Sequence, residues 1–265
     1  SLTKTNDIFI HLACISNEPS FELNPDLGKS INFDCFEEIV NISKKNSIKR
    51  FILASSGAVY GINDSKNITE ETITNPITDY AKYKLQSEKI LFNHTDDNFI
   101  GTAIRSATVC GYAPRQRLDV VVNILTNLAY NKKEISVFGG DQLRPNIHID
   151  DVCKAYHNFI QADSRKINHN FFNLCGENHK VSEIAEIVKS CMPFNVSIKT
   201  TTSDDIRSYH LSSTKVKEIL NFECEKNIKI AVNDLIHSFK TGLLPNSMDD
   251  DNYYNVKKMK NINLI

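Results

Sequence analysis

The sequence predicts an α/β fold, in which a mainly parallel, doubly wound sheet is accompanied by a smaller C-terminal lobe. Three short apolar runs rich in Ile and Phe have the length of buried strands, and patterns of helical period lie between them. Strands that alternate with helices of this length form right-handed βαβ units, which build a parallel sheet. A chain of 265 residues is long enough for one large domain, or for one domain with a smaller lobe.

The three predicted strands cover residues 7–13 (DIFIHLA), 49–56 (KRFILASS) and 99–109 (FIGTAIRSATV). In a parallel sheet of this kind, ligands bind at the carboxyl ends of the strands. We therefore expect the residues at these three ends to share one crevice. They are His11, Leu12, Ala13, Ser55, Ser56, Ala107 and Thr108.

Two helices are predicted between these strands. The first covers residues 30–46, because apolar residues recur there at near-helical spacing, namely Ile31, Cys35, Ile39, Val40 and Ile42. The second covers residues 79–94 (DYAKYKLQSEKILFNH) and has Tyr83, Ile90 and Leu91 available for packing.

Beyond Gly111 the pattern changes. The predicted elements are a basic loop (112–117, YAPRQR), an amphipathic helix (118–130), a strand, turn and strand (135–151), a helix (152–161), a strand (170–174) and a helix (181–191). The final third is more polar, and we expect it to form the smaller lobe and a tail.

The composition argues against several classes of function. With 31 Lys and Arg against 32 Asp and Glu, the net charge of −1 gives no reason to expect a nucleic-acid partner or a membrane surface. The apolar runs are far shorter than the roughly 20 residues that span a bilayer. The first residues also lack the order of a signal peptide. We expect a cytoplasmic protein.

The cysteine and histidine residues show no metal-binding or disulfide pattern. The seven cysteines are scattered, without a C-x-x-C pair, which predicts reduced thiols. The eight histidines show no metal-ligand spacing such as H-x-x-x-H, so no metal is assigned.

The stretch DYAKYKLQSEK places Tyr80 four residues before Lys84, on the same face of a predicted helix. A phenol with a pKa near 10 becomes a useful base when an ammonium lies one turn away. Ser56, at a neighbouring strand end, could hold the same substrate oxygen. The alternative is that Tyr80 packs, Lys84 is solvated and Ser56 caps a turn. The same spacing recurs at Tyr253 and Tyr254, but in a polar tail with no adjacent strand.

Five ordered motifs resemble those of the extended short-chain dehydrogenase/reductases, and in particular the NAD-dependent nucleotide-sugar epimerase/dehydratase group. They are HLA after an apolar strand, FILASSGAVYG, PITDYAKYKLQSEK, IRSATVCGYAPRQR and VFGGDQLRPNIHIDDVCKAY. The resemblance implies a Rossmann-type domain that binds NAD or NADP, and a lobe that binds a nucleoside diphosphate-sugar. The domain would comprise residues 1–112 and 146–175, and the lobe and tail residues 113–145 and 176–265.

The resemblance also implies roles for individual residues. Tyr80 matches the catalytic base, Lys84 the residue that holds the nicotinamide ribose, and Ser56 the residue that touches the reacting hydroxyl. The positions that match cofactor contacts are Leu12, Ala13, Tyr80, Lys84 and Ala107. Those that match substrate contacts are Ser56, Thr108, Asn123, Phe138, Arg144 and Arg207. Asn123 and the two arginines would contact the diphosphate, and Phe138 would stack near the nucleotide base. Thr108 stands where the family often has Asn.

The sequence departs from the family pattern at its start. No G-x-x-G-x-x-G turn, which would cradle the pyrophosphate, occurs among its nine glycines. The first predicted strand corresponds to the fourth of the family, so about two βα units are absent. We therefore expect that the natural N-terminus is missing from this sequence. Were these residues the whole protein, a binding-only protein would be the better interpretation.

A second departure bears on the reaction. Family members that eliminate water carry an acid directly after the Ser/Thr, where this chain has Gly57 and Ala58. This favours redox chemistry at one carbon, by a nucleotide-sugar 4-epimerase or 4-keto-reductase. The alternatives are a 4,6-dehydratase that takes its acids from elsewhere, or a non-catalytic nucleotide-binding protein. Many relatives dimerise through the helix that carries the tyrosine, so we expect a homodimer.

Overall fold

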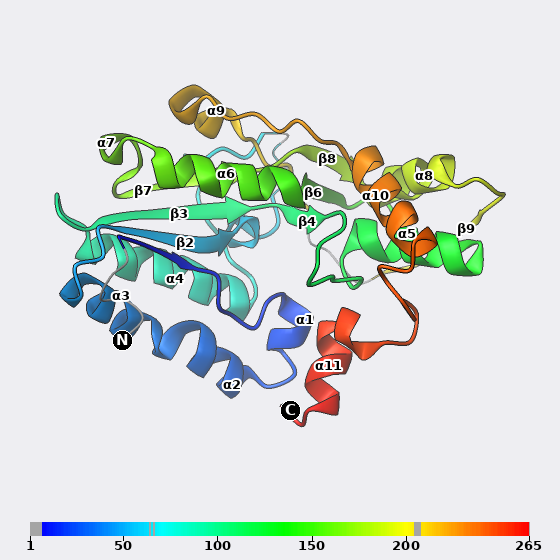
Figure 1. Ribbon diagram of the computed structural model, residues 1–265, viewed down its shortest axis with the longest axis horizontal. Helices are drawn as coiled ribbons and strands as arrows, with labels where there is room; N and C mark the ends of the chain where they lie inside the picture. Colours follow the sequence, from blue (N-terminus) through cyan, green and yellow to red (C-terminus); the bar gives the residue numbers. More distant parts are fainter. Residues whose placement is uncertain (1–6, 64, 66, 204–207, 265) are drawn as a thin grey trace.

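The computed structural model describes residues 7–264, apart from 64, 66 and 204–207. Its central feature is a four-stranded parallel sheet, shown in Figure 1. The strands lie in the order β1 (Ile8–His11), β2 (Arg50–Ser56), β3 (Ile100–Ser106) and β7 (Asn170–Leu174). All four carboxyl ends therefore point to the same edge. The predicted α/β fold with a parallel sheet is confirmed.

Helices cover both faces of this sheet (Figure 1). On one face lie α4 (Asp79–His94) and the helical run α2 (Pro25–Lys29), η1 (Ser30–Asp34) and α3 (Phe36–Lys45), whose middle turn η1 is a π-helix. On the other face lies α6 (Ile149–Gln161).

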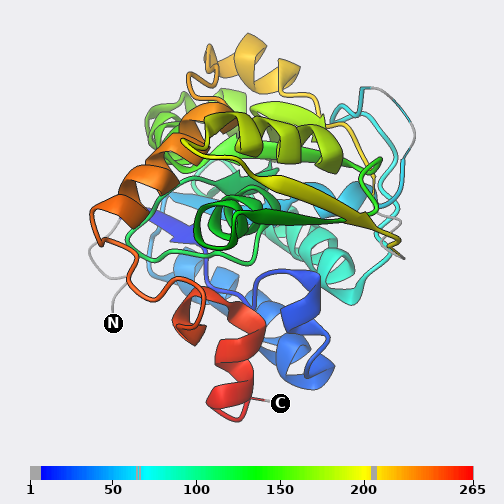
Figure 2. The same ribbon diagram turned by 90° about the vertical axis from the view of Figure 1, so that its right-hand side faces the viewer.

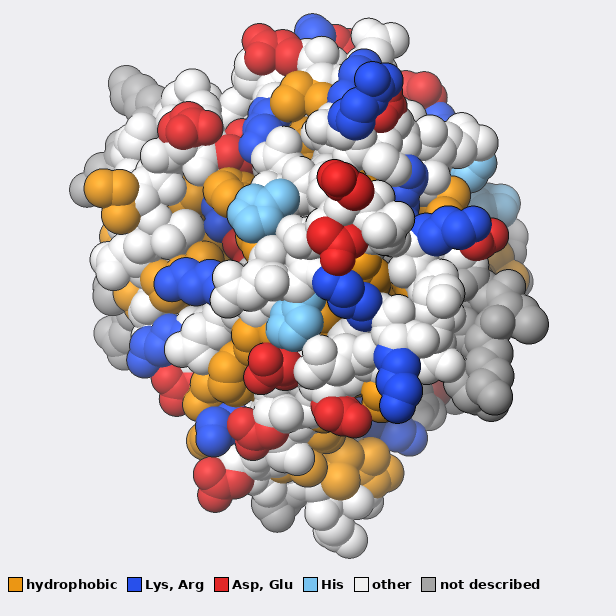
Figure 3. Space-filling model, turned by 90° about the vertical axis from the view of Figure 1, so that its left-hand side faces the viewer, with side chains coloured by type: hydrophobic (Ala, Val, Ile, Leu, Met, Phe, Trp, Pro, Cys, Tyr) orange, Lys and Arg blue, Asp and Glu red, His pale blue; other side chains and the backbone are white. Residues whose placement is uncertain are grey.

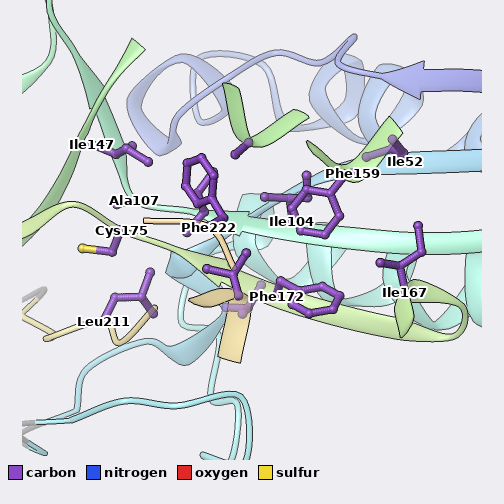
Figure 4. Packing of buried hydrophobic residues seen from close by; sticks show 14 of the residues in the cluster. Ile52, Ile104, Ala107, Ile147, Phe159, Ile167, Phe172, Cys175, Leu211 and Phe222 are labelled. Carbon is purple, nitrogen blue, oxygen red and sulfur yellow. The ribbon is translucent and has the colours of Figure 1, made fainter. Parts of the chain in front are cut away.

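Side chains alternate along the strands and so fill two separate cores. On β2, Phe51 and Leu53 pack with Phe36 of α3. Ile52, between them, packs on the opposite face with Phe159 of α6, as Figure 4 shows. Successive residues of β2 thus contribute to the two cores in alternation.

The predicted strand 99–109 is two strands, which corrects the sequence prediction. The amide of Ala107 still donates to the carbonyl of Leu174 in β7, at 2.8 Å, and there the pairing with the main sheet ends. The chain continues as β4 (Thr108–Cys110), in a second sheet with β6 (Leu143–His148) and β8 (Glu177–Lys180).

The smaller lobe, which faces the viewer in Figure 2, has its own apolar core. Its strands β5 (Glu134–Phe138) and β9 (Ser197–Thr201) pair in parallel. The helices α5 (Val121–Lys132), α8 (Val181–Cys191) and α10 (Ile228–Lys240) pack beside them. Neither β8 nor β9 was predicted, since their polar sequences lack a strand pattern.

Short helices complete the described chain: α1 (Glu18–Phe21), α7 (Ser164–Ile167), α9 (Thr214–Leu220), α11 (Asn255–Asn261), and the 3-10 turns η2 (Gly57–Tyr60) and η3 (Asp251–Tyr253). Leu211, Val216 and Phe222 belong to the core of the main sheet, although they follow residue 176. The predicted division into domain and lobe stays a prediction. Tyr253 and Tyr254 of the tail pack against Leu118 and Leu235 of the lobe.

The surface at the amino ends of the strands carries charges of both signs, close together, as Figure 3 shows. Lys44 pairs there with Asp96, and Lys49 with Asp7. Among the residues that the structure describes, no helix has the length and apolar character needed to cross a bilayer.

Candidate active site

The three residues predicted for catalysis come together at the carboxyl edge of the sheet. Tyr80 lies in the first turn of α4, whose capping residue Thr78 accepts a hydrogen bond from the amide of Ala81 at 3.2 Å. The side chain of Ser56, the last residue of β2, lies close enough to the Tyr80 hydroxyl to lower the pKa of that group. Lys84 is buried, and its Nζ lies 5.8 Å from the centre of the Tyr80 ring.

The ammonium group of Lys84 is anchored to the sheet. Its Nζ donates to the carbonyl oxygen of Ala54, two residues before Ser56, at 2.7 Å. With respect to the described residues, this bond uses one of its three N–H groups, so two are left to donate to hydroxyl groups of a ligand. His11, at the end of β1, has its pKa lowered to about 4 by burial and by the charge of Lys84. The imidazole is therefore neutral at pH 7.

The electrostatic surroundings keep the Tyr80 phenol protonated at neutral pH. Burial raises its pKa above the usual value, and repulsion from Cys14 and Glu18 adds to this. Arg117 and the side chain of Ser56 act in the opposite direction and lower this pKa. A protonated phenol can donate to a carbonyl oxygen, and a nearby cation favours the phenolate needed for the reverse transfer.

The segment that follows β1 lies open beside this site. Leu12 is 60% exposed and Ala13 is exposed as well, as suits backbone that passes a flat ligand. Asn32 holds the next part of the segment. Its Oδ1 accepts from the amide of Ile15 at 2.7 Å, and its Nδ2 donates to the carbonyl of Ile15 at 2.9 Å.

Ala107 and Thr108 lie at the same edge, as predicted. Ser56 pairs with Ser106 in the sheet, so Ala107 is the next residue beyond that pair. Ala107 is buried and its amide is bonded to β7, whereas Thr108 is half-buried and opens β4. Their predicted contacts with cofactor and substrate stay predictions.

The predicted diphosphate residues have different surroundings. Asn123 is buried, with its Oδ1 accepting from the amide of Gly111 at 3.0 Å and its Nδ2 donating to the carbonyl of Arg117 at 2.8 Å. It therefore shapes the loop 111–117. Arg144 is half-buried in β6 and donates to the carbonyl of Leu143 at 3.1 Å. Arg207 lies outside the described residues.

Phe138 ends β5 with its side chain 62% exposed. It stands beside a hollow of about 610 Å³, whose lining is rich in hydroxyl groups and includes Gly139, Gln142, Thr200, Thr201 and Ser208. Ser208 Oγ accepts from the amide of Leu143 at 3.0 Å, which brings this segment next to β6 and Arg144.

Sequence reasoning missed Arg117, which it treated only as part of a basic loop. Its Nε donates to Asp119 at 2.8 Å and its Nη1 to Ser16 Oγ at 3.3 Å. Its Nη2 is buried without a hydrogen-bond partner in the described part of the chain. Because Arg117 also lowers the pKa of Tyr80, it brings a cation close to the predicted base.

Residues 2–175 match the model of the NAD dependent epimerase/dehydratase family. The chain belongs to this family. A relative described as an uncharacterized UDP-glucose epimerase, YtcB of Bacillus subtilis, is 30% identical over 160 residues, which are 58% of this chain and 49% of the relative. A UDP-glucuronate 4-epimerase of Thermodesulfobacterium geofontis is 24% identical over 83% of this chain and 68% of its own length.

Solved structures give the same family fold. A UDP-glucose 4-epimerase of Thermotoga maritima with UDP-glucose has a TM-score of 0.78 at 25% identity, over 89% of this chain and 78% of that one. A UDP-glucuronic acid 4-epimerase of Bacillus cereus, in complex with UDP-glucuronic acid and NAD, has a TM-score of 0.80 at 20% identity, over 91% and 77%. The chain spans about half or less of the length of three curated relatives.

Proposed function

We propose that this protein is an NAD(P)-dependent nucleotide-sugar 4-epimerase or 4-keto-reductase. The observation that carries the proposal is the arrangement of Ser56, Tyr80 and Lys84, in which a serine hydroxyl and an anchored ammonium group flank one phenol. Such a unit moves a proton to or from one oxygen atom, as alcohol oxidation and ketone reduction require.

Each residue has a separate task in this proposal. Ser56 Oγ holds the reacting sugar oxygen next to Tyr80. In the reductive direction the Tyr80 phenol gives its proton to the 4-keto oxygen, and in the oxidative direction the phenolate takes the hydroxyl proton. The charge of Arg117 stabilises that phenolate. When bound, NAD or NADP would supply the hydride acceptor for oxidation of the sugar carbon and, in its reduced form, the hydride donor for reduction.

The residues present fit the nicotinamide-ribose end of such a cofactor. Within the part of the chain that the structure describes, Lys84 retains two free N–H groups, and the exposed segment at Leu12 and Ala13 leaves room beside them. Lys84 would hold the ribose hydroxyls, while Asn32 keeps the backbone of Ile15 in place. A Gly-rich turn for the pyrophosphate does not occur in the printed sequence.

Gly57 supports redox at one carbon rather than elimination of water. A Cβ atom at this position would lie 3.3 Å from both Leu211 and Tyr209, so an acidic side chain would fit only if these neighbours moved aside. Ala58 cannot act as an acid either. A 4,6-dehydratase would have to take its acid from another element, which makes it the second candidate.

A nucleoside diphosphate-sugar is the proposed substrate. Arg144, the hollow beside Phe138 and the predicted contribution of Arg207 offer cationic and hydroxyl groups for a diphosphate and its nucleoside. Structures of family members titled with UDP-glucose and UDP-glucuronic acid support this class. We also propose a homodimer, since Ile31 and Ile42, on the helices beside α4, are 38% and 42% exposed.

The test is to incubate the protein, expressed from its complete reading frame, with UDP-, GDP-, CDP- and dTDP-sugars. A product inverted or reduced at C4 is expected, together with NAD or NADP recovered from the purified protein. A 4-keto-6-deoxy product would establish the dehydratase instead. Failure to bind NAD(P) and to turn over any sugar would favour a non-catalytic nucleotide-binding protein.

A further inference from the structure

A buried polar network joins α4 to β2 and β3, directly beside the proposed catalytic residues. The side chains of Glu88 on α4 and Arg105 on β3 are 2% and 3% exposed. Arg105 donates twice to the carboxylate, from Nε to Oε1 at 2.9 Å and from Nη2 to Oε2 at 2.6 Å. The hydroxyl of Ser55 donates to the same Oε1. Two parallel bonds of this kind fix orientation as well as distance.

Arg105 also holds the chain that follows Ser56. Its Nη1 donates to the hydroxyl of Tyr60 at 2.8 Å, and that hydroxyl donates to Asn173 Oδ1 at 2.8 Å. The guanidinium carbon lies 3.7 Å from the centre of the Phe171 ring. Burial alone would lower the pKa of Arg105, but the hydrogen bonds and charge of Glu88 outweigh it and raise the pKa. The group remains a cation with fixed partners.

The network therefore bonds to residues on both sides of Ser56 in the sequence. These are Ser55, directly before it, and Tyr60, four residues after it. The network also extends a series of contacts between α4 and β2. Tyr80, Lys84 and Glu88 follow one another at intervals of four on one helix face. Lys84 bonds to the carbonyl of Ala54 and Glu88 to the side chain of Ser55, while the Tyr80 hydroxyl lies near the side chain of Ser56. These contacts fix the position of α4 along the strand.

We propose that Glu88, with Ser55 and Arg105, is a positioning unit that holds the Tyr80 hydroxyl against Ser56. Stability alone gives little reason for such a network, because a buried ion pair is often no more stable than apolar side chains of similar volume. Fixed geometry is a better reason, since a misplacement of about 1 Å at a reacting group can cost 100-fold in rate. The proposal rests on the proposed roles of Ser56 and Tyr80.

The experiment that tests it uses the full protein labelled with ¹³Cζ-tyrosine and observed by NMR at neutral pH. The Tyr80 line is identified by its absence in Tyr80→Phe, and Ser56→Ala is expected to displace it. Ser56→Ala is then combined with each of two background substitutions, Ser55→Ala and Glu88→Gln. Ser55→Ala removes one hydroxyl and leaves the ion pair of Glu88 and Arg105. In both backgrounds we expect less than half of the original displacement, because the Tyr80 hydroxyl has already moved away from Ser56.

Arg50→Lys is the matched control. Arg50 begins the same strand and donates to the carbonyl oxygens of Phe159 and Ala162, at 2.7 and 2.8 Å, far from Ser56. Its loss should lower stability while Ser56→Ala still displaces the Tyr80 line in full. A full displacement in Ser55→Ala as well, or no displacement by Ser56→Ala in the unaltered protein, would overturn the positioning role. If Glu88→Gln does not fold, the comparison in the Ser55→Ala background tests the positioning role by itself.

Steady-state turnover is a second measurement that tests the positioning role. With a sugar that the protein accepts, Ser55→Ala should lower kcat about tenfold with KM unchanged, and Arg50→Lys should leave both unchanged. An unchanged kcat in Ser55→Ala would count against the unit. If the unaltered protein turns over no sugar, the proposed function fails, and the NMR comparison still decides the positioning role by itself.

Discussion

Replacement of Asn32 is expected to release the segment that passes the proposed cofactor. In Asn32→Ala, the amide and the carbonyl of Ile15 both lose their partner, at 2.7 and 2.9 Å. Asn32 is 8% exposed, so water replaces these bonds poorly. An unsatisfied buried group costs about 1–3 kcal/mol, so the free energy of unfolding should fall by about 2–4 kcal/mol.

Two further variants separate the contributions. Asn32→Asp keeps the oxygen that accepts from the Ile15 amide but places a carboxylate oxygen against its carbonyl, and should be nearly as destabilised. Asn46→Ala loses an exposed bond from Nδ2 to the carbonyl of Ile42 at 2.8 Å, and should change the free energy by less than about 0.5 kcal/mol.

Urea denaturation measures these free energies, and hydrogen exchange measures the local effect. The Ile15 amide should exchange at least about tenfold faster in Asn32→Ala than in Asn46→Ala. Asn32→Ala should also bind NAD(P) more weakly. Unchanged exchange at Ile15, with stability within about 0.5 kcal/mol of the original, would refute the role assigned to Asn32.

Two other predictions concern Gly57 and His11. Gly57→Asp should lower the free energy of unfolding by about 1–3 kcal/mol, because its Cβ meets Leu211 and Tyr209 at 3.3 Å. The variant should yield no 4-keto-6-deoxy sugar. Formation of such a product would show that the space accepts an acid. In the folded protein the pKa of His11 is lowered from 6.5 to about 4. The unfolded chain therefore binds this proton more readily than the folded protein does. As a result, the free energy of unfolding falls as the pH drops below about 6.5. Between pH 7 and 5 the loss should be about 2 kcal/mol greater than in His11→Leu, and equal losses in denaturation curves would contradict it.

Elements with a strong local signal are predicted closely by the sequence. The helix predicted at residues 79–94 and the strand at 170–174 have the bounds found in the structure. The buried side of the helix at 30–46 is different from what its apolar spacing suggests. Ile31, Cys35 and Ile42 are exposed, whereas Asn32 and Phe36 are buried, because the π-helical turn η1 changes the angular phase of the residues along the helix.

Long-range partners account for the site residues that sequence reasoning missed. Asn32, Arg117 and Glu88 have no motif of their own. Each gains a role only when the fold brings it to Ile15, Tyr80 or Ser55, from segments far apart in the chain. Ser56, Tyr80 and Lys84 were predictable because a strand end and a helical spacing of four place them together without knowledge of side-chain contacts.

Turnover by Tyr80→Phe is the most direct measurement of the central claim, that this phenol moves the proton of the reacting hydroxyl. Tyr83→Phe is the control, since its ring would keep the stacking of Tyr83 on Phe33, at 4.9 Å between centres, and lose only a hydroxyl. With an accepted nucleotide-sugar, Tyr80→Phe should lower kcat at least about 100-fold and Tyr83→Phe should leave it unchanged. Equal turnover by Tyr80→Phe and the unaltered protein would contradict the mechanism.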